Sequence, residues 1–178
     1  LYASSNTFKR ITFASASFAT SVLHFERNTF SCVSAACVSF TTSPILVGAL
    51  HQWNDNTLTQ VSGAGDGLTY DSNSPLKAGS TLRVLSNTFD TNSLATPALF
   101  VFAGDGQIDV VLEIANNDFS LSKVYLTLHD AKKVKLMNNK LQDAAGIVWN
   151  VKTVSTGSER ECACNANADT TTHSCGSE

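Results

Sequence analysis

The sequence has few charged residues. Asp, Glu, Lys and Arg make up 15% of its 178 residues, against about a quarter in an average soluble domain. The formal net charge is -3, and the densest basic run, Lys132, Lys133 and Lys135, is too short to form a basic surface. We therefore expect no nucleic acid among the partners of this chain.

Long apolar segments are also missing. No run approaches the roughly 20 residues of a membrane-spanning helix, and no charged-then-apolar signal segment opens the chain. We expect no membrane contact within this chain. Because it starts at Leu1 rather than Met, we interpret it as a piece of a longer polypeptide.

Two further absences narrow the fold and the surface. No stretch shows the 3.6-residue apolar period of an amphipathic helix, which argues against helical solenoids. None of the 14 Asn begins an Asn-x-Ser/Thr sequon, so we expect no N-linked glycans here.

The cysteines are odd in number and fall in two groups. Their density near the C-terminus favours an oxidising, extracellular setting. The Cys-x-Cys spacing lacks the Cys-x2-Cys pairs of a structural zinc site, and His173 alone does not complete one. Possible disulfide partners are Cys32, Cys37, Cys162, Cys164 and Cys175.

A short motif recurs along the chain: Asn followed two residues later by Phe or Leu. Successive Asn are 22, 28, 31, 30 and 22 residues apart. The motif alone is weak, because Asn92 and Leu94 also fit it. The Asn of the six convincing copies are Asn6, Asn28, Asn56, Asn87, Asn117 and Asn139.

The residues around each Asn carry the interpretation. Alternating apolar positions followed by a polar turn predict a short strand with one buried face, then a bend. Only His51 breaks this rule. The predicted core residues three positions before Asn and two after it are Phe25, Phe30, Trp53, Leu58, Val84, Phe89, Ile114, Phe119, Leu136 and Leu141; those five before it are Leu23, His51, Leu82, Leu112 and Val134.

The Asn itself has two explanations, and both stay open at this point. Asn tolerates left-handed backbone angles and suits a bend. In stacked coils, each amide could also bond the next one in a ladder.

Six further runs of β-branched or aromatic residues provide additional strands, at residues 11–13, 38–40, 68–70, 99–102, 124–128 and 147–151. We predict an all-β, right-handed parallel β-helix of about six imperfect coils of 22–31 residues over residues 1–157. A polar, Cys-containing segment at 158–178 then leads out of the solenoid. An antiparallel β-sandwich is the alternative.

Few residues suggest chemistry. The loops Gly65-Asp66-Gly67 and Gly104-Asp105-Gly106 supply too few oxygens for calcium, and we interpret them as turns. The outward residues Arg83, Glu113 and Lys135 fit a solvent ion-pair row better than a polysaccharide-lyase site. The four His have no fixed relation to a nucleophile, so we predict no catalytic residue, no metal and no cofactor.

Several phrases resemble the trypanosomatid dispersed gene family of very large surface proteins. They are Ser74-Pro75-Leu76-Lys77, the run Gly-Ser-Thr-Leu-Arg-Val-Leu-Ser-Asn-Thr-Phe at residues 79–89, and the recurrent Asn-Thr-Phe. The resemblance extends to about Val154. It implies an extracellular-facing, adhesin-like protein held by distant C-terminal membrane segments, which this chain lacks, and it carries over no catalytic residue.

We therefore expect a non-enzymatic segment of a large cell-surface or extracellular protein, acting as an adhesin-like binding module or a structural scaffold. Its partner would be a glycan or a host or neighbouring surface protein. The alternatives are a carbohydrate-active β-helix, either a lyase or a glycan binder, and a spacer or filament subunit whose open strand edges stack on neighbours.

Overall fold

The computed structural model describes residues 1–9, 11–14, 22–33, 37–41, 47–62, 67–70, 76–90, 97–103, 109–119, 123–129, 131–141, 147–152 and 159–163. Within these ranges the chain forms strands and no helix. The strand pairings between these residues are parallel. The all-β prediction is confirmed. The alternative of an antiparallel sandwich is wrong, because such a fold is built from antiparallel neighbours.

The strands form three sheets, and each sheet takes every third strand. The first sheet contains β1 (Tyr2–Ser4), β4 (Val22–Glu26), β7 (Leu50–Asn54), β10 (Thr81–Leu85), β13 (Val110–Ala115), β16 (Ala131–Met137) and β19 (Glu159–Ala163). The second sheet contains β2 (Thr7–Phe8), β5 (Thr29–Val33), β8 (Thr57–Ser62), β11 (Thr88–Asp90), β14 (Asp118–Phe119) and β17 (Lys140–Leu141). The third sheet contains β3 (Ile11–Ala14), β6 (Val38–Thr41), β9 (Leu68–Tyr70), β12 (Pro97–Ala103), β15 (Lys123–His129) and β18 (Ile147–Lys152).

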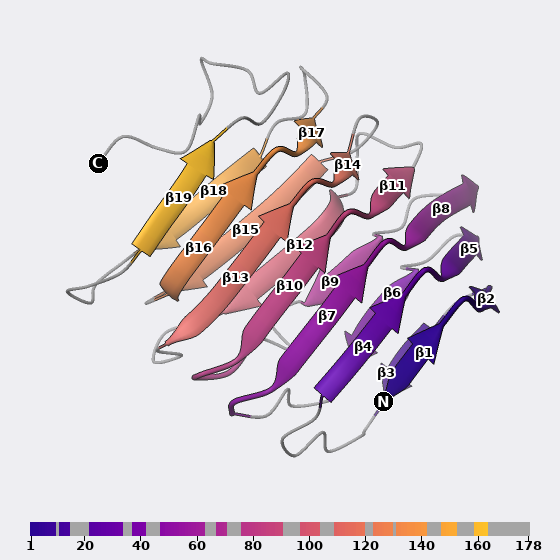
Figure 1. Cartoon of the computed structure of the whole chain (residues 1–178), viewed down its shortest axis with the longest axis horizontal. Coiled ribbons are helices and arrows are strands. Elements are labelled where there is room, and N and C mark those ends of the chain that lie inside the picture. Colours follow the sequence, from indigo (N-terminus) through magenta and orange to yellow (C-terminus); the bar gives the residue numbers. More distant parts are fainter. Residues whose placement is uncertain are drawn as a thin grey trace.

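Figure 1 shows how the sheets are arranged. The strands of the first sheet lie side by side in chain order, from β1 at the indigo end to β19 at the yellow end. Each of β1, β4, β7, β10, β13 and β16 continues past a bend into a strand of the second sheet. The third sheet lies behind the first in this view. None of the three sheets closes on itself within the described residues.

The core is built from inward residues that stand in register between neighbouring strands of the first sheet. Phe25 pairs with Trp53, which pairs with Val84 on the next strand. The rings of Phe25 and Trp53 stack with centroids 4.5 Å apart. In the second sheet Phe89 and Phe119 stack in the same way at 4.8 Å. Each such buried side chain contributes about 1.5–3 kcal/mol relative to an exposed one.

The predicted core residues lie as follows. Those whose side chains the structure describes are at most 2% exposed, namely Phe25, Phe30, Trp53, Leu58, Val84, Phe89, Ile114, Phe119 and Leu136. Leu141 is the last residue of β17, and its side chain lies outside the described part of the structure.

The six runs expected to provide additional strands coincide with the third sheet. Its strands β3, β6, β9, β12, β15 and β18 overlap those runs to within a residue or two at either end. Alternating β-branched and aromatic residues are enough to predict strands, because the period of two marks one buried face.

The strands continue beyond the predicted domain boundary at residue 157. Residues 159–163 form β19, which pairs in parallel with β16 as a further strand of the first sheet. The sequence hides this strand because Arg160 and Cys162 stand in register with Val134 and Leu136, which breaks the apolar pattern. Strand pairing uses backbone groups, so it tolerates that break. Residues 164–178 lie outside the described residues.

Candidate functional site: an asparagine ladder and an exposed sheet face

The six motif Asn form a hydrogen-bonded ladder at the bend between the first and second sheets. From Asn6 to Asn117, each ladder Asn uses its backbone N–H and its Nδ2 to donate to the Oδ1 of the next ladder Asn along the chain. The backbone N to Oδ1 distances are 2.8–3.1 Å, and the Nδ2 to Oδ1 distances are 3.0–3.3 Å. The ladder therefore has a direction, with every rung donating toward the C-terminal end.

The amide also ties each layer to an earlier strand. Asn87 Nδ2 donates to the carbonyl of Trp53 at 2.7 Å, and Asn117 Nδ2 donates to that of Val84 at 2.8 Å. The five inner rungs are 1% exposed, while Asn6 at the N-terminal edge is exposed. Buried amides stabilise a fold only when their donors and acceptors are satisfied. The ladder meets that condition, so its role is structural.

The backbone angles at the bend argue against the explanation that Asn is there because it tolerates a left-handed conformation. The left-handed residue is the one before each ladder Asn, at Ser5, Arg27, Asp55, Ser86, Asn116 and Asn138, with φ of 53–59°. The ladder Asn themselves are not left-handed. The backbone angle therefore does not explain them, and their side-chain hydrogen bonds do.

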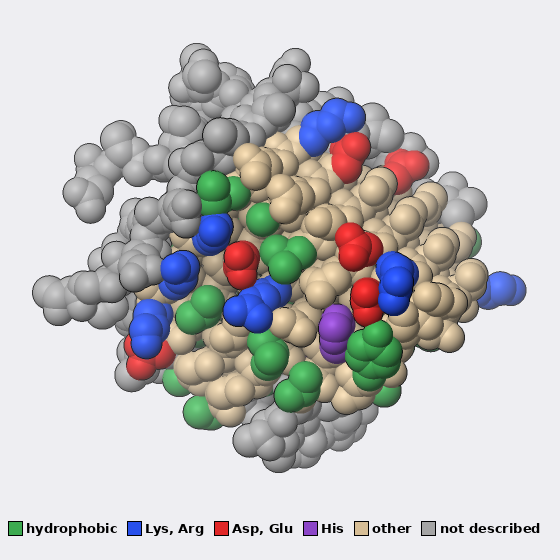
Figure 2. Space-filling view, in the orientation of Figure 1, with side chains coloured by type: hydrophobic (Ala, Val, Ile, Leu, Met, Phe, Trp, Pro, Cys, Tyr) green, Lys and Arg blue, Asp and Glu red, His purple; other side chains and the backbone are tan. Residues whose placement is uncertain are grey.

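The outward face of the first sheet presents one central residue per strand. The row is in register from strand to strand and consists of Tyr2, His24, Gln52, Arg83, Glu113 and Lys135. Each of these side chains is exposed or half-buried. Figure 2 shows this face, where charged and apolar side chains alternate across the front of the sheet.

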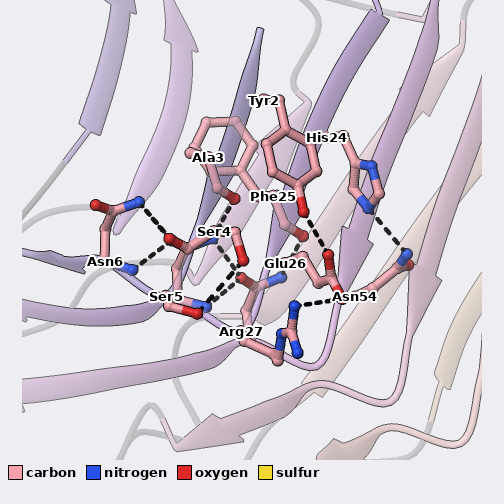
Figure 3. Close-up of polar contacts among 12 residues, drawn as sticks. Tyr2, Ala3, Ser4, Ser5, Asn6, His24, Phe25, Glu26, Arg27 and Asn54 are labelled. Atoms are coloured by element: carbon pink, nitrogen blue, oxygen red, sulfur yellow. Dashed lines mark hydrogen bonds and ion pairs between the residues drawn. The ribbon is translucent and has the colours of Figure 1, made fainter.

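Contacts between neighbouring strands organise the row. Arg83 Nε donates to Glu113 Oε2 at 3.2 Å, with side chains 42% and 30% exposed. At the N-terminal edge, Tyr2 donates its hydroxyl proton to Glu26 at 2.7 Å, and His24 contacts Asn54 (Figure 3). These are solvent-screened contacts that leave the polar atoms open to further partners.

Apolar side chains border the charged row. Val22, two positions before His24 of the row, is 54% exposed. Leu50 and Val111 are half-buried on the same outward register, two positions before the central row. The face therefore combines charge, hydrogen-bonding groups and apolar surface, which is the mixture typical of protein and glycan contact surfaces.

Two of the candidate disulfide cysteines are bonded to each other. Cys32 in β5 and Cys37 just before β6 form a disulfide with a Cα–Cα distance of 5.2 Å, and both are buried. The backbone of Cys162 lies in β19, but its side chain lies outside the described part. Cys164 and Cys175 also lie outside the described residues.

A buried polar cluster accounts for the one exception to the apolar pattern. Tyr70 Oη accepts a hydrogen bond from Trp53 Nε1 at 2.9 Å and lies 3.0 Å from His51 Nδ1. Burial lowers the pKa of His51 to about 4, and the N-terminal ammonium adds to this effect. Burial also raises the pKa of Tyr70, against the opposing hydrogen bond from Trp53. The sequence signal for this cluster was the single polar residue among inward apolar ones.

The remaining sequence candidates give no site. Within the described residues no group of three or more His, Cys, Asp or Glu is arranged to hold a metal ion. The loops at Gly65-Asp66 and at Gly104-Asp105-Gly106 lie outside the described residues. No helix in the described part of the chain is long and apolar enough to cross a membrane.

Comparisons with protein-family models, with curated proteins and with solved structures found no match to this chain.

Proposed function

We propose that the three sheets are the three faces of one right-handed parallel β-helix, with the asparagine ladder along one of its corners. The pairing of every strand with the strand three positions further on supports this proposal. The hand follows from the general rule that about 98% of crossovers between parallel strands are right-handed. This proposal depends on the strand register, which an engineered disulfide can test. Thr57→Cys with Thr88→Cys joins paired residues of β8 and β11 and should form a disulfide, whereas Thr57→Cys with Asp118→Cys spans two strand spacings and should not.

We further propose that the chain is a non-enzymatic segment of a large extracellular or cell-surface protein, adhesin-like or scaffolding in role. Its resemblance to the trypanosomatid dispersed gene family supports this assignment. The disulfide between Cys32 and Cys37 fits an oxidising compartment. The hydrogen-bonded ladder and the packed interior are typical of a rigid scaffold rather than of an enzyme with an internal active-site cavity.

The outward face of the first sheet is the observation that carries the binding role. Around β10, β13 and β16 it presents Arg83, Lys133, Lys135 and Glu113, and Glu159 and Glu161 of β19 stand in register with the two lysines. The first four side chains are half-buried, so part of their surface is already desolvated. The guanidinium and ammonium groups of this mixed-charge surface can donate to the anionic groups of a glycan or of a neighbouring surface protein.

Binding of the labelled full chain to an anionic glycan array and to intact cells tests this role. The double variant Arg83→Glu with Lys135→Glu should weaken binding by at least about tenfold, since each reversed charge costs on the order of 1 kcal/mol. The matched control, Lys9→Glu with Lys140→Glu, makes the same change of charge on exposed residues of the N-terminal edge and the second sheet. It should change binding less than twofold. Equal losses in both variants would reject the face, and no binding by the wild type would reject the adhesin-like role.

A second candidate function, a spacer or filament subunit, is favoured by the regular stacking of parallel strands in all three sheets. Sedimentation velocity at rising concentration tests this function, and a constant monomeric coefficient would contradict it.

A further inference from the structure

One layer of the protein, formed by β7, β8 and β9, differs from its neighbours at a core position. His51 on β7 is 1% exposed and stands in register with Leu23 on β4 and Leu82 on β10. Leu112, on the next strand, continues the apolar row. An ionisable imidazole thus occupies a site that the neighbouring layers fill with leucine.

The hydrogen bonds of this layer determine the protonation state of His51. Trp53 Nε1 can only donate, so it donates to Tyr70 Oη. The hydroxyl proton of Tyr70 is then free to bond His51 Nδ1, 3.0 Å away. If Nδ1 carried the proton instead, the hydroxyl proton of Tyr70 and the Nε2 atom of His51 would both lack a partner among the described residues. With the proton on Nε2, only Nε2 lacks one. His51 is therefore neutral, with its proton on Nε2, a buried atom that has no hydrogen-bond partner among the described residues.

The surroundings of the ring offer no compensation for a positive charge. Phe40 on β6 and Tyr70 on β9 pack against the imidazole, with centroids 5.5 and 5.7 Å away. On β4 and β10 the charged or titratable groups are His24, Glu26 and Arg83, which occupy the outward positions of their strands. No carboxylate among the described side chains of β4, β6, β9 and β10 takes an inward position.

We propose that His51 is an acid-sensitive release point: its protonation opens the contact between β7 and β9, while layers with an aliphatic residue at the same position stay closed. Protonation makes Nδ1 a donor, so the hydroxyl of Tyr70 can no longer donate to it. Oη would then have to accept from both His51 and Trp53, while its own proton and the Nε2 proton lack an acceptor among the described residues and the buried ring carries an uncompensated charge. Opening the layer rehydrates the imidazolium. The aromatic side chains of Phe40 and Tyr70 become exposed at the same time.

The pH window follows from the two states of His51. Burial lowers its pKa from 6.5 to about 4 in the closed layer, and the opened layer restores the ordinary value. The opened state therefore binds more protons, so the closed layer is fully stable above pH 6.5 and loses stability as the pH falls toward 4. At pH 4.5 the opening equilibrium should be larger than at pH 7.5 by roughly 50- to 100-fold.

Hydrogen exchange of the full chain at pH 7.5 and 4.5, corrected for the intrinsic pH dependence of exchange, measures this opening. Backbone amides of β7 and β9 should lose protection by roughly that factor relative to those of β13. His51→Leu restores the residue type of the neighbouring layers and should abolish the difference. His24→Gln removes an outward histidine and should leave it unchanged. A pH effect in His51→Leu equal to that of the wild type would overturn the proposal.

A second measurement needs no variant at the core position. NMR titration of the histidine ring signals in the wild-type chain should show His51 titrating below about pH 5, together with the opening of its layer. A midpoint near 6.5 without loss of amide protection would show that the pocket accepts the charge, and would equally overturn the proposal.

Discussion

Two rows of residues run through this protein side by side, each with one residue per layer, and they follow opposite rules. The ladder row is Asn in each of its six layers. The outward row of the first sheet holds six different residue types in six consecutive strands, from Tyr2 to Lys135. Both rows are in register, so stacking alone does not demand a single residue type.

Burial and hydrogen-bond count explain the difference. An inner ladder Asn has to accept two hydrogen bonds and donate in two directions without help from water. Only an amide of that length supplies both functions at one place. A residue of the outward row completes its hydrogen bonds with solvent, so its identity is open to selection for contacts with partners.

The largest expected effect breaks the ladder. Asn87→Ala leaves the backbone N–H and one Nδ2 proton of Asn56 without an acceptor, and we expect it to lower the free energy of unfolding by about 3–5 kcal/mol. In the outward row, Gln52→Ala should change it by less than about 0.5 kcal/mol. Equilibrium urea denaturation measures both. A loss below about 1 kcal/mol in Asn87→Ala would mean that the ladder is replaceable.

The next effect concerns the disulfide that joins Cys32 in β5 to Cys37, just before β6. The Cys32–Cys37 bond spans five residues of sequence, and a loop of that size restricts the unfolded chain by about 2 kcal/mol. The double variant Cys32→Ala with Cys37→Ala should lose that amount. Reduction of the wild type should give a similar shift of the urea midpoint. If neither treatment alters the midpoint, the disulfide does not contribute to the stability of the fold.

A smaller effect tests the left-handed residue beside the ladder. Arg27 has φ of 53°, where a β-branched side chain is strained by about 1–2 kcal/mol. Arg27→Val should lower the melting temperature accordingly, and Arg27→Asn should leave it nearly unchanged. Thr29→Val, on an exposed strand position two residues later, serves as the control and should be neutral. Equal melting temperatures for the two Val variants would contradict this account of the bend.

The smallest effect belongs to the outward row itself. A double-mutant cycle on Arg83→Ala and Glu113→Ala should give a coupling of only a few tenths of a kcal/mol, because both side chains are partly exposed and screened. The coupling should vanish at about 1 M salt. A coupling above about 1.5 kcal/mol would show that this row stabilises the fold, which would narrow the contrast with the ladder.

Much of the strand pattern could be predicted from the sequence. Apolar residues three and five positions before each Asn mark the strands of the first sheet, and they do so because inward and outward positions alternate with a period of two. The strand at residues 159–163 escaped prediction because Arg160 interrupts the apolar pattern at the position in register with Val134. A search for alternating apolar residues cannot find a strand whose residues do not alternate in this way, even though its backbone pairs normally.

The sites were harder to predict than the strands. His51 was visible only as an exception, because its partner Tyr70 is 19 residues away and belongs to another sheet. The left-handed residue was assigned to Asn, whose chemistry suits it, and lies one position earlier at residues as different as Arg27 and Asp55. Such positions are exposed, and only Asp55, Asn116 and Asn138 among them carry a side chain typical of left-handed angles.

By itself, the sequence determined that the chain is all-β and which residues face its core, because alternation and turn chemistry are local properties. The tertiary structure alone decided between parallel and antiparallel pairing, placed β19 in the first sheet and brought His51 to Tyr70. Contacts between layers and sheets, such as those of Trp53 with Tyr70 and with Asn87, join residues 17 and 34 positions apart. Their free energy depends on burial and hydrogen bonds that exist only once the layers are stacked.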